Sequence, residues 1–431
     1  MHIEELSLKK RFDFFLGFLI FGSISTSITF RTDIFILLLV ILAIFIWFKS
    51  WHQLRSKQTP LVIRFWIFTL IVYALVWFFS LYNTVGATAG DYEKPAKVLV
   101  CAFIASQLVK RRIRSEFIKY GMVFCILLAA ISAGYSTETY SSGSRLDFGM
   151  NAGLVAYQLM VAVLFCMTHL IFGIDLKLPE KTLFLIFILV GIWTLSETQT
   201  RGVVLVFIAY AAVLVPLKIR DLILKRDCAK FSPKIAVVAI VMAVLAVLMF
   251  TNTKIQERFL ATFDRIDNRI DETIEEITRI QSGDLEGAIG RRVALYQVGM
   301  EAVKTPSLLG KGENAAANLS SYISLMKDPE RYEFIKENIH FHNQYLDIFT
   351  KRGGVGILIF IAFLFGPLVY ANPRQRIYLL SAILPLAVGG LVETPLNSSN
   401  FVKHYPLYVT FILVFIFQEK PTPNQALNAA S

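Results

Sequence analysis

The sequence has few charged residues, which make up 17% of its 431 positions, whereas hydrophobic residues make up 55%. This balance excludes an ordinary soluble globular domain, in which about a quarter of the residues are charged. Cysteine is also scarce. Cys101, Cys125 and Cys166 lie in apolar runs and Cys228 lies in a basic connecting segment, so a disulfide between external segments is not expected. Cys and His pairs at zinc-ligand spacing are lacking as well.

The apolar residues are gathered in runs of about the length that crosses a bilayer, and the mean hydropathy of the chain is +0.58. A helix of about 20 apolar residues spans the hydrocarbon core and satisfies its own backbone hydrogen bonds there. We expect about twelve such spans, with about eleven or thirteen left open. They cover residues 14–30, 34–48, 61–81, 96–109, 117–133, 149–172, 182–195, 203–217, 235–250, 355–370, 377–391 and 405–417. The predicted fold class is therefore an all-α polytopic membrane protein.

The loops between these runs alternate in charge. Lys and Arg cluster in the loops of one side, at 9–11, 49–57, 110–114, 177–181, 218–234 and 374–376, whereas the loops of the other side carry scattered cations. Because Lys and Arg accumulate in cytoplasmic loops, both termini are predicted to be cytoplasmic. The formal net charge of +11 follows from this bias and from contact with anionic lipid heads, so it does not indicate nucleic-acid binding.

The longest gap between apolar runs, 251–342, is predicted to be a helical loop domain on the non-cytoplasmic side, between the ninth and tenth spans. The other predicted divisions are membrane helices at 1–250 and 343–420 and a cytoplasmic tail at 421–431. Apolar residues in the loop recur at spacings of three and four: Phe259, Phe263, Ile266, Ile270, Ile274 and Ile277. This pattern predicts an amphipathic helix against the membrane surface or the top of the bundle.

Three polar clusters fall on the external side. The first, at 196–202, is a very short junction between two spans and carries Arg201. A guanidinium at the membrane interface is costly to desolvate unless it has an anionic partner. Arg201 therefore either binds an anionic ligand, or extends to water or pairs with Glu197. The residues leave these alternatives open.

The second cluster, at 290–296, begins a predicted helix that runs from Arg291 to about Val303 and is stopped by Pro306. Cations beside the exposed N–H groups of a helix start suit phosphate oxygens, although for Arg291 and Arg292 taken alone a solvated basic helix start is the better explanation. Positive charge could also come from three other external residues, which are otherwise ordinary loop charges: Lys94, Lys97 and Arg145.

The third cluster, at 340–343, holds His340 and His342 just before the tenth predicted span. Imidazole can take a proton from a hydroxyl near neutral pH. A His-x-His pair could instead bind a metal, but alternate residues of a helix point in different directions and a third ligand is not evident. We therefore expect no metal site here, and proton transfer is the chemistry that the pair could perform.

The first two clusters resemble motifs of the bacterial O-antigen ligase family, within the wider group of O-antigen polymerases and ligases. Residues 198–201, Thr-Gln-Thr-Arg, are similar to the arginine motif that the family carries at a short external turn. Residues 290–296 are similar to its loop arginine followed four residues later by an aromatic. That register selects Arg292 with Tyr296, a position at which the wider group often has Trp.

The third cluster, His-Phe-His-Asn at 340–343, is similar to the family's His-x-His-Asn signature, in which the histidine before the asparagine is catalytic. This selects His342. The resemblance implies a GT-C type glycosyltransferase of the inner membrane that transfers O-antigen polysaccharide from undecaprenyl pyrophosphate to a sugar hydroxyl of the lipid A-core oligosaccharide, at the periplasmic face. It implies that Arg201 and Arg292 stabilise the pyrophosphate and that His342 is the general base, with inversion at the anomeric carbon.

The external segments contain no Asp-x-Asp pair that could hold a divalent ion against a pyrophosphate, so neither a metal nor another cofactor is expected. An O-antigen polymerase or a protein O-oligosaccharyltransferase would use the same donor, and analogy between folds does not choose the acceptor. A transporter or flippase is the alternative from another class. Transporters place ionisable groups deep within their spans, whereas here the polar clusters gather at one face.

Overall fold

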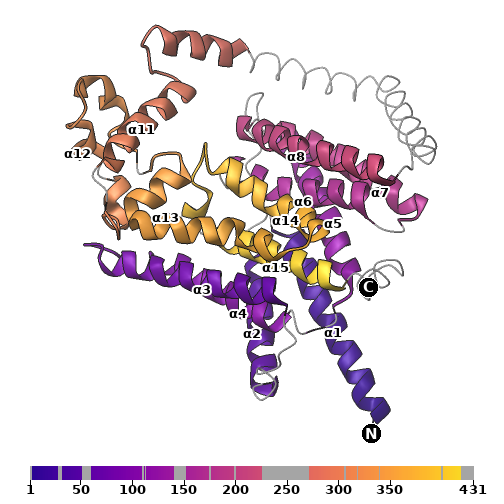
Figure 1. Cartoon of the computed structure of the whole chain (residues 1–431). Coiled ribbons are helices and arrows are strands. Elements are labelled where there is room, and N and C mark those ends of the chain that lie inside the picture. The colour runs from indigo at the N-terminus through magenta and orange to yellow at the C-terminus, as the bar shows by residue number, and fades with distance from the viewer. Residues whose placement is uncertain are drawn as a thin grey trace.

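The structure, a computed structural model, is helical throughout the residues that it describes, and no β-strand occurs among them (Figure 1). These residues are 2–27, 32–50, 60–108, 111, 113–139, 152–173, 176–198, 200–225, 271–304, 307–317, 319–338, 340–398 and 401–418. The described helices before residue 251 are α1 (His2–Ser25), α2 (Thr32–Ser50), α3 (Leu61–Tyr82), α4 (Glu93–Leu108), α5 (Ser115–Thr139), α6 (Ala152–Phe172), α7 (Leu178–Glu197) and α8 (Arg201–Lys225).

The later elements are α11 (Ala288–Val303), the 3-10 helix η3 (Glu313–Ala317), α12 (Leu319–Ile323), η4 (Pro329–Ile335), α13 (Gln344–Tyr370), α14 (Pro373–Gly389), η5 (Pro395–Asn397) and α15 (Phe401–Gln418).

Five of the described helices are long and apolar enough to cross a membrane, and they are α3, α5, α6, α7 and α13. Shorter apolar helices lie at Phe12–Ser25, Ile34–Phe45, Gly202–Leu217 and Phe401–Phe417. The all-helical class is confirmed. The count of about twelve spans stays a prediction, since the run at 235–250 lies outside the described residues.

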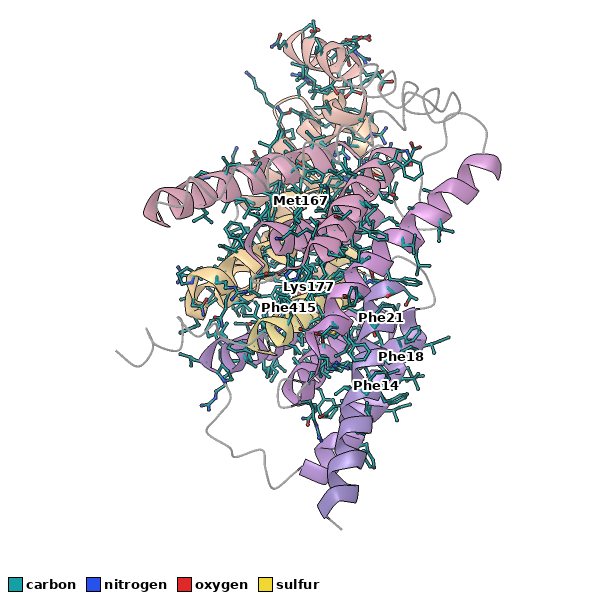
Figure 2. All side chains as sticks on the ribbon, turned by 90° about the vertical axis from the view of Figure 1, so that its right-hand side faces the viewer. Phe14, Phe18, Phe21, Met167, Lys177 and Phe415 are labelled. Atoms are coloured by element: carbon teal, nitrogen blue, oxygen red, sulfur yellow. The ribbon has the colours of Figure 1, made fainter. Side chains whose placement is uncertain are left out.

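The membrane helices share one hydrophobic core in which α6 is enclosed, because nearly every residue from Ala152 to His169 is buried. Aromatic rings join α3 to the last helices: Trp66 stacks on Phe363 with ring centroids 5.4 Å apart and donates a hydrogen bond to Thr410 Oγ1. On α1, by contrast, Phe14 and Phe18 project outward from the ribbon and are about half exposed (Figure 2). Large exposed apolar side chains on such a helix are suited to contact with lipid.

The segment between α8 and α13 has a smaller hydrophobic core of its own, formed by α11, α12, η4 and the chain before α13. We call this segment the loop domain. Figure 1 shows α11 and α12 beside the start of α13, at one end of the membrane helices. The helix predicted from Arg291 is present and begins earlier, at Ala288. Of the predicted amphipathic helix, only residues from 271 onward are described. Ile274 and Ile277 are 57% and 45% exposed there, so these two side chains do not bury against the bundle.

The helix expected to begin at residue 355 begins instead at Gln344, as the first residue of α13. Asn343 caps it, because its side-chain oxygen accepts hydrogen bonds from the N–H groups of Tyr345 and Leu346. The helix is kinked at Gly353, whose φ of 70° and ψ of −165° interrupt it. A Cβ at this position would lie 2.3 Å from the Ser307 carbonyl oxygen, so only glycine fits. The kink sets a short polar segment, 344–352, apart from the apolar remainder of α13.

Candidate functional site

Glu393, in the loop between α14 and α15, contacts two of the residues predicted from the sequence. Its Oε1 accepts a hydrogen bond from Nη2 of Arg292 at 2.9 Å, and its Oε2 lies 3.1 Å from Nδ1 of His342. All three side chains are partly buried, and Glu393 is 18% exposed. One carboxylate therefore holds a cation of the loop domain and the imidazole that precedes α13.

Arg292 reaches this position from the first turns of α11. Its Nε donates to the carbonyl oxygen of Val392 and its Nη1 donates to the carbonyl oxygen of Ala288, both at 3.2 Å. A guanidinium has more N–H donors than these bonds and the Glu393 contact use. The neighbouring Arg291 points outward and is exposed. Of the two arginines that begin the helix, Arg292 is thus the one at the site.

The loop that carries Glu393 is fixed by hydrogen bonds to the start of α13 and to α11. The backbone N–H of Gln344 donates to the Gly390 carbonyl oxygen at 2.7 Å, and Asn343 Nδ2 donates to the Leu391 carbonyl oxygen at 3.2 Å. The Tyr296 hydroxyl bonds to the carbonyl oxygens of both Leu391 and His342. The aromatic residue four positions after Arg292 therefore joins the loop to the histidine.

His342 has a φ of 50° and is the one non-glycine residue with positive φ in the part of the chain that the structure describes. This conformation is sparsely populated for residues with a Cβ, and such strain persists where surrounding contacts enforce it. Here the N–H of His342 donates to Nδ1 of His340 at 3.3 Å, and the two rings meet edge to face with centroids 4.2 Å apart. Burial, followed by the neighbouring His342, lowers the pKa of His340. His340 thus positions its neighbour.

The charge state of Glu393 decides which nitrogen of His342 carries the proton. Burial raises the pKa of the Glu393 carboxyl, but its contacts with His342 and Arg292 lower it by more, so the net pKa lies below the ordinary value. An ionised carboxylate only accepts hydrogen bonds. In a neutral His342 ring, Nδ1 must therefore carry the proton, which leaves Nε2 as the nitrogen that can accept one.

Arg201 is the first residue of α8, and its side chain lies outside the described residues. Its backbone nevertheless lies beside the loop that carries Glu393. A Cβ on the next residue, Gly202, would lie 3.1 Å from Cγ2 of Val392 in that loop. The turn before it is closed by bonds from Thr198 N–H to the Leu195 carbonyl oxygen and from Val203 N–H to that of Thr200. The structure thus brings the Arg201 backbone, Arg292 and His342 to one loop.

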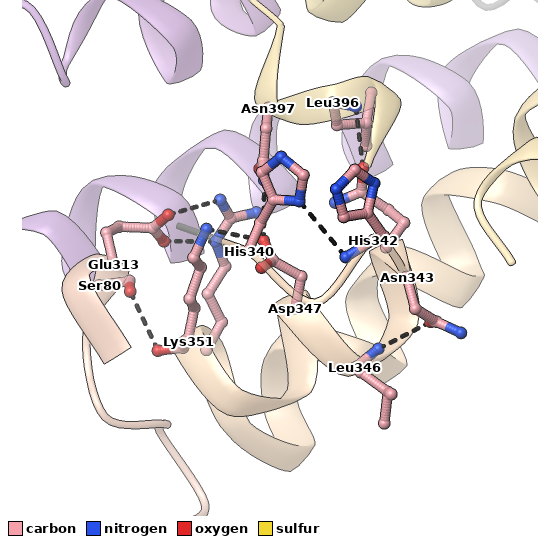
Figure 3. A network of polar contacts seen from close by, with 12 residues as sticks. Ser80, Glu313, His340, His342, Asn343, Leu346, Asp347, Lys351, Leu396 and Asn397 are labelled. Carbon is pink, nitrogen blue, oxygen red and sulfur yellow. Dashed lines mark hydrogen bonds and ion pairs between the residues drawn. The ribbon is translucent and has the colours of Figure 1, made fainter. Parts of the chain in front are cut away.

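A second polar cluster lies beside this site, on the first segment of α13 (Figure 3). Lys351 Nζ lies 2.7 Å from Oδ2 of Asp347, which also accepts a hydrogen bond from Asn397 Nδ2 at 3.0 Å. Arg352 pairs with both carboxylate oxygens of Glu313 at 2.7 and 3.1 Å. These contacts connect α13 with η3 and η5.

Arg352 also joins the cluster to α3. It donates to the Tyr73 hydroxyl at 2.9 Å, and its guanidinium lies 3.8 Å from the centre of the Trp77 ring. Burial raises the pKa of the Glu313 carboxyl, but the charge and hydrogen bonds of Arg352 lower it by more. The pair therefore stays ionised and joins the loop domain to the membrane helices.

The other cations noted in the sequence fall in different places. Lys94, at the start of α4, interacts electrostatically with Lys351 and Glu313, so it belongs to the second cluster. Lys97 pairs with Glu93 on its own helix, and Arg145 lies outside the described residues. Within those residues, His, Cys, Asp and Glu side chains form no group of three or more that could hold a metal ion.

Sequence reasoning did not single out Glu393. It is the only acidic residue between Asp347 and Glu419, and an isolated carboxylate in a short loop between two apolar runs is a signal that could have found it. Asp347 and Lys351 were missed as well, although their spacing of four places them on one face of a helix. A span that starts at residue 355 places both of them in a loop.

Two comparisons with known proteins both identify similarity to O-antigen ligases. Residues 182–361 match the family model described as O-antigen ligase. An O-antigen ligase of Escherichia coli (strain K12) is 23% identical over 363 residues, which cover 78% of this chain and 78% of that protein. The segment matched by the family model includes Arg201, Arg292 and His342 and ends before Glu393.

Proposed function

Since residues 182–361 carry the O-antigen ligase family domain, we propose that this chain transfers O-antigen polysaccharide from undecaprenyl pyrophosphate to a sugar hydroxyl of the lipid A-core oligosaccharide. The bridge from Arg292 through Glu393 to His342 is the observation that carries the proposal. It places a proton acceptor beside a cation that suits pyrophosphate, and polysaccharide transfer from a pyrophosphate requires both.

His342 is the general base. Glu393 accepts a hydrogen bond from the N–H at Nδ1 and fixes the ring, so Nε2 can take the proton of the acceptor hydroxyl. As that proton leaves, the hydroxyl oxygen forms a bond to the anomeric carbon. The bond from this carbon to the pyrophosphate oxygen breaks on the opposite face, and the anomeric centre inverts. The imidazolium that results is stabilised by the Glu393 carboxylate.

Arg292 and Arg201 stabilise the leaving group. Negative charge grows on the pyrophosphate as the bond to the sugar breaks, so cations placed there act more strongly on the transition state than on the ground state. In the structure, Arg292 is neutralised by Glu393. Arriving pyrophosphate competes for this guanidinium, whose remaining N–H donors are suited to phosphate oxygens.

The proposed setting follows from the predicted topology. Arg201 and His342 lie at the ends of membrane helices, with Arg292 beside them on α11, and all three are on the predicted external side. The reaction therefore takes place at the periplasmic face of a bacterial inner membrane. Donor and acceptor are both anchored by lipid and reach the site from the bilayer. Polar groups on the two lipids can therefore meet without leaving the membrane surface.

The test is transfer by the full-length protein, reconstituted in lipid vesicles with undecaprenyl-pyrophosphate-linked O-antigen. One reaction receives lipid A-core as acceptor, and a parallel reaction receives a second lipid-linked repeat unit. We expect polysaccharide on the lipid A-core only. Extension of the lipid-linked repeat, as by an O-antigen polymerase, or transfer to neither acceptor would contradict the proposal.

A further inference from the structure

Tyr157, on α6, is a buried polar residue that the proposed mechanism does not use. Its side chain is 0% exposed, and its hydroxyl forms no hydrogen bond among the described residues. Buried tyrosine hydroxyls usually have a partner, since an unpaired one loses the hydrogen bonds that water would provide. An unpaired hydroxyl inside a membrane protein therefore calls for a ligand or another explanation.

Two glycines make room for this tyrosine. A Cβ on Gly202, in the first turn of α8, would lie 2.3 Å from the Tyr157 hydroxyl oxygen, and a Cβ on Gly389, at the end of α14, would lie 2.7 Å from Cε1 of the ring. Only residues without a side chain allow this approach. The hydroxyl is thus held against the N-terminal turn of α8, next to the backbone of Arg201.

The start of α8 is suited to an anion. The first N–H groups of an α-helix have no partner within the helix, and the helix dipole places partial positive charge there. α8 is 25 residues long. The Tyr157 hydroxyl also interacts electrostatically with Glu393 and Arg292, and Gly202 faces Val392, whose carbonyl oxygen accepts the Arg292 hydrogen bond.

We propose that the Tyr157 hydroxyl is a further phosphate-binding group, which donates a hydrogen bond to an oxygen of the donor's pyrophosphate together with the first turn of α8. This inference rests on the proposed function and adds a residue to it. The donor's pyrophosphate would complete the hydrogen bonding of a hydroxyl that is otherwise unsatisfied. Tyr157 lies on α6, outside the segment that matches the family model, so the site takes a contribution from the part of the chain before it.

The test compares two variants that each remove one buried hydroxyl. Tyr157→Phe keeps the ring between the two glycines. Tyr210→Phe is the matched control, because Tyr210 is also buried but donates to the Leu164 carbonyl oxygen at 2.9 Å. Binding of inorganic pyrophosphate to the full-length protein in lipid nanodiscs is measured by calorimetry, and thermal unfolding is measured on the same samples.

We expect Tyr157→Phe to weaken pyrophosphate binding about tenfold or more, since a hydrogen bond to a charged group is lost. Its unfolding temperature should be unchanged or higher, because the hydroxyl has no partner in the folded protein. Tyr210→Phe should show the reverse pattern, with lower stability and unchanged affinity. Affinity of Tyr157→Phe equal to that of the wild type overturns the inference.

A second variant covers the case in which Tyr157→Phe does not fold. Gly202→Ala keeps the hydroxyl but displaces it, and we expect weaker pyrophosphate binding from it too. Unchanged affinity would count against the inference.

The outcomes of the binding and transfer measurements separate this inference from the proposed function. A wild type that transfers polysaccharide, with Tyr157→Phe binding normally, refutes the inference alone. Pyrophosphate binding that depends on Tyr157, without transfer to either acceptor, refutes the function alone. A wild type that neither binds pyrophosphate nor transfers polysaccharide refutes both.

Discussion

Oε2 of Glu393 lies 3.1 Å from Nδ1 of His342, on the far side of the ring from the nitrogen that would accept a proton. The other oxygen of the same carboxylate receives Arg292. A substitution of Glu393 therefore removes a contact from both His342 and Arg292, whereas a substitution of either partner leaves the other contact of Glu393 in place. The predictions below separate these effects.

Replacing His342 by alanine is expected to lower transfer by about 100-fold to 10,000-fold, because general-base catalysis contributes about this much. Transfer is measured in membranes with donor and acceptor supplied, at matched protein levels. Retained binding of inorganic pyrophosphate would show that the variant is folded. Transfer by His342→Ala at the wild-type rate would remove His342 from the mechanism.

Replacing Glu393 by glutamine is expected to lower transfer by about 10-fold to 100-fold, because the amide can donate to Nδ1 and favour the wrong tautomer of His342. Glu393→Asp keeps the charge and should recover part of the activity. The loss should appear in kcat more than in the KM for the acceptor, since orientation of the base acts in the transition state. Equal loss in both variants would contradict a role that depends on charge.

Replacing Arg292 by lysine keeps the charge but loses the planar fork that binds two oxygens at once. We expect transfer to fall about tenfold or more. Arg291→Lys is the matched control, since Arg291 is the neighbouring residue of the same helix and is exposed, and its activity should stay near that of the wild type. If both variants behave alike, Arg292 acts only as a surface charge.

The stability of the site should depend on pH in a defined direction. Burial raises the pKa of Glu393, but its contacts with His342 and Arg292 lower it by more, so its pKa is lower in the folded than in the unfolded protein. Such a group stabilises the fold above its unfolded pKa, about 4.3, and this stabilisation is lost as the pH falls through the folded value. The difference in unfolding temperature between wild type and Glu393→Gln should therefore be largest above about pH 5 and shrink below about pH 4. If this difference in unfolding temperature grew toward acid pH, the pKa of Glu393 would not be lowered by folding.

Replacing Arg352 by methionine leaves Glu313 buried without its cation, because the Arg352 side chain is 2% exposed and makes two contacts to that carboxylate. We expect a loss of about 3–5 kcal/mol in stability, seen as a lower unfolding temperature in nanodiscs. Glu313→Gln added to Arg352→Met should recover part of it. Lys336→Met, which breaks the exposed Lys336–Glu333 pair, is the control and should change little.

The sequence alone determined the helical membrane class, because the length and apolar content of each run are local properties, and they decide whether a helix can span a bilayer. It also placed α11 to within a few residues, and the resemblance selected Arg292 over Arg291. It did not place the start of α13. Polar residues such as Asp347 and Lys351 interrupt the apolar run there, and only the Asn343 cap and the Gly353 kink reveal a short helical segment before it.

The tertiary structure decided which residues meet. Glu393 is 51 residues from His342 and 101 from Arg292 along the chain, and Tyr157 reaches Gly202 and Gly389 from a different helix. Hydrophobic periodicity reports only which face of each helix is apolar, over neighbours three or four residues apart. Contacts between distant segments depend on how helices pack and how loops close over them, so the site became visible only when α6, α8, α11, α13 and the loop after α14 were placed together.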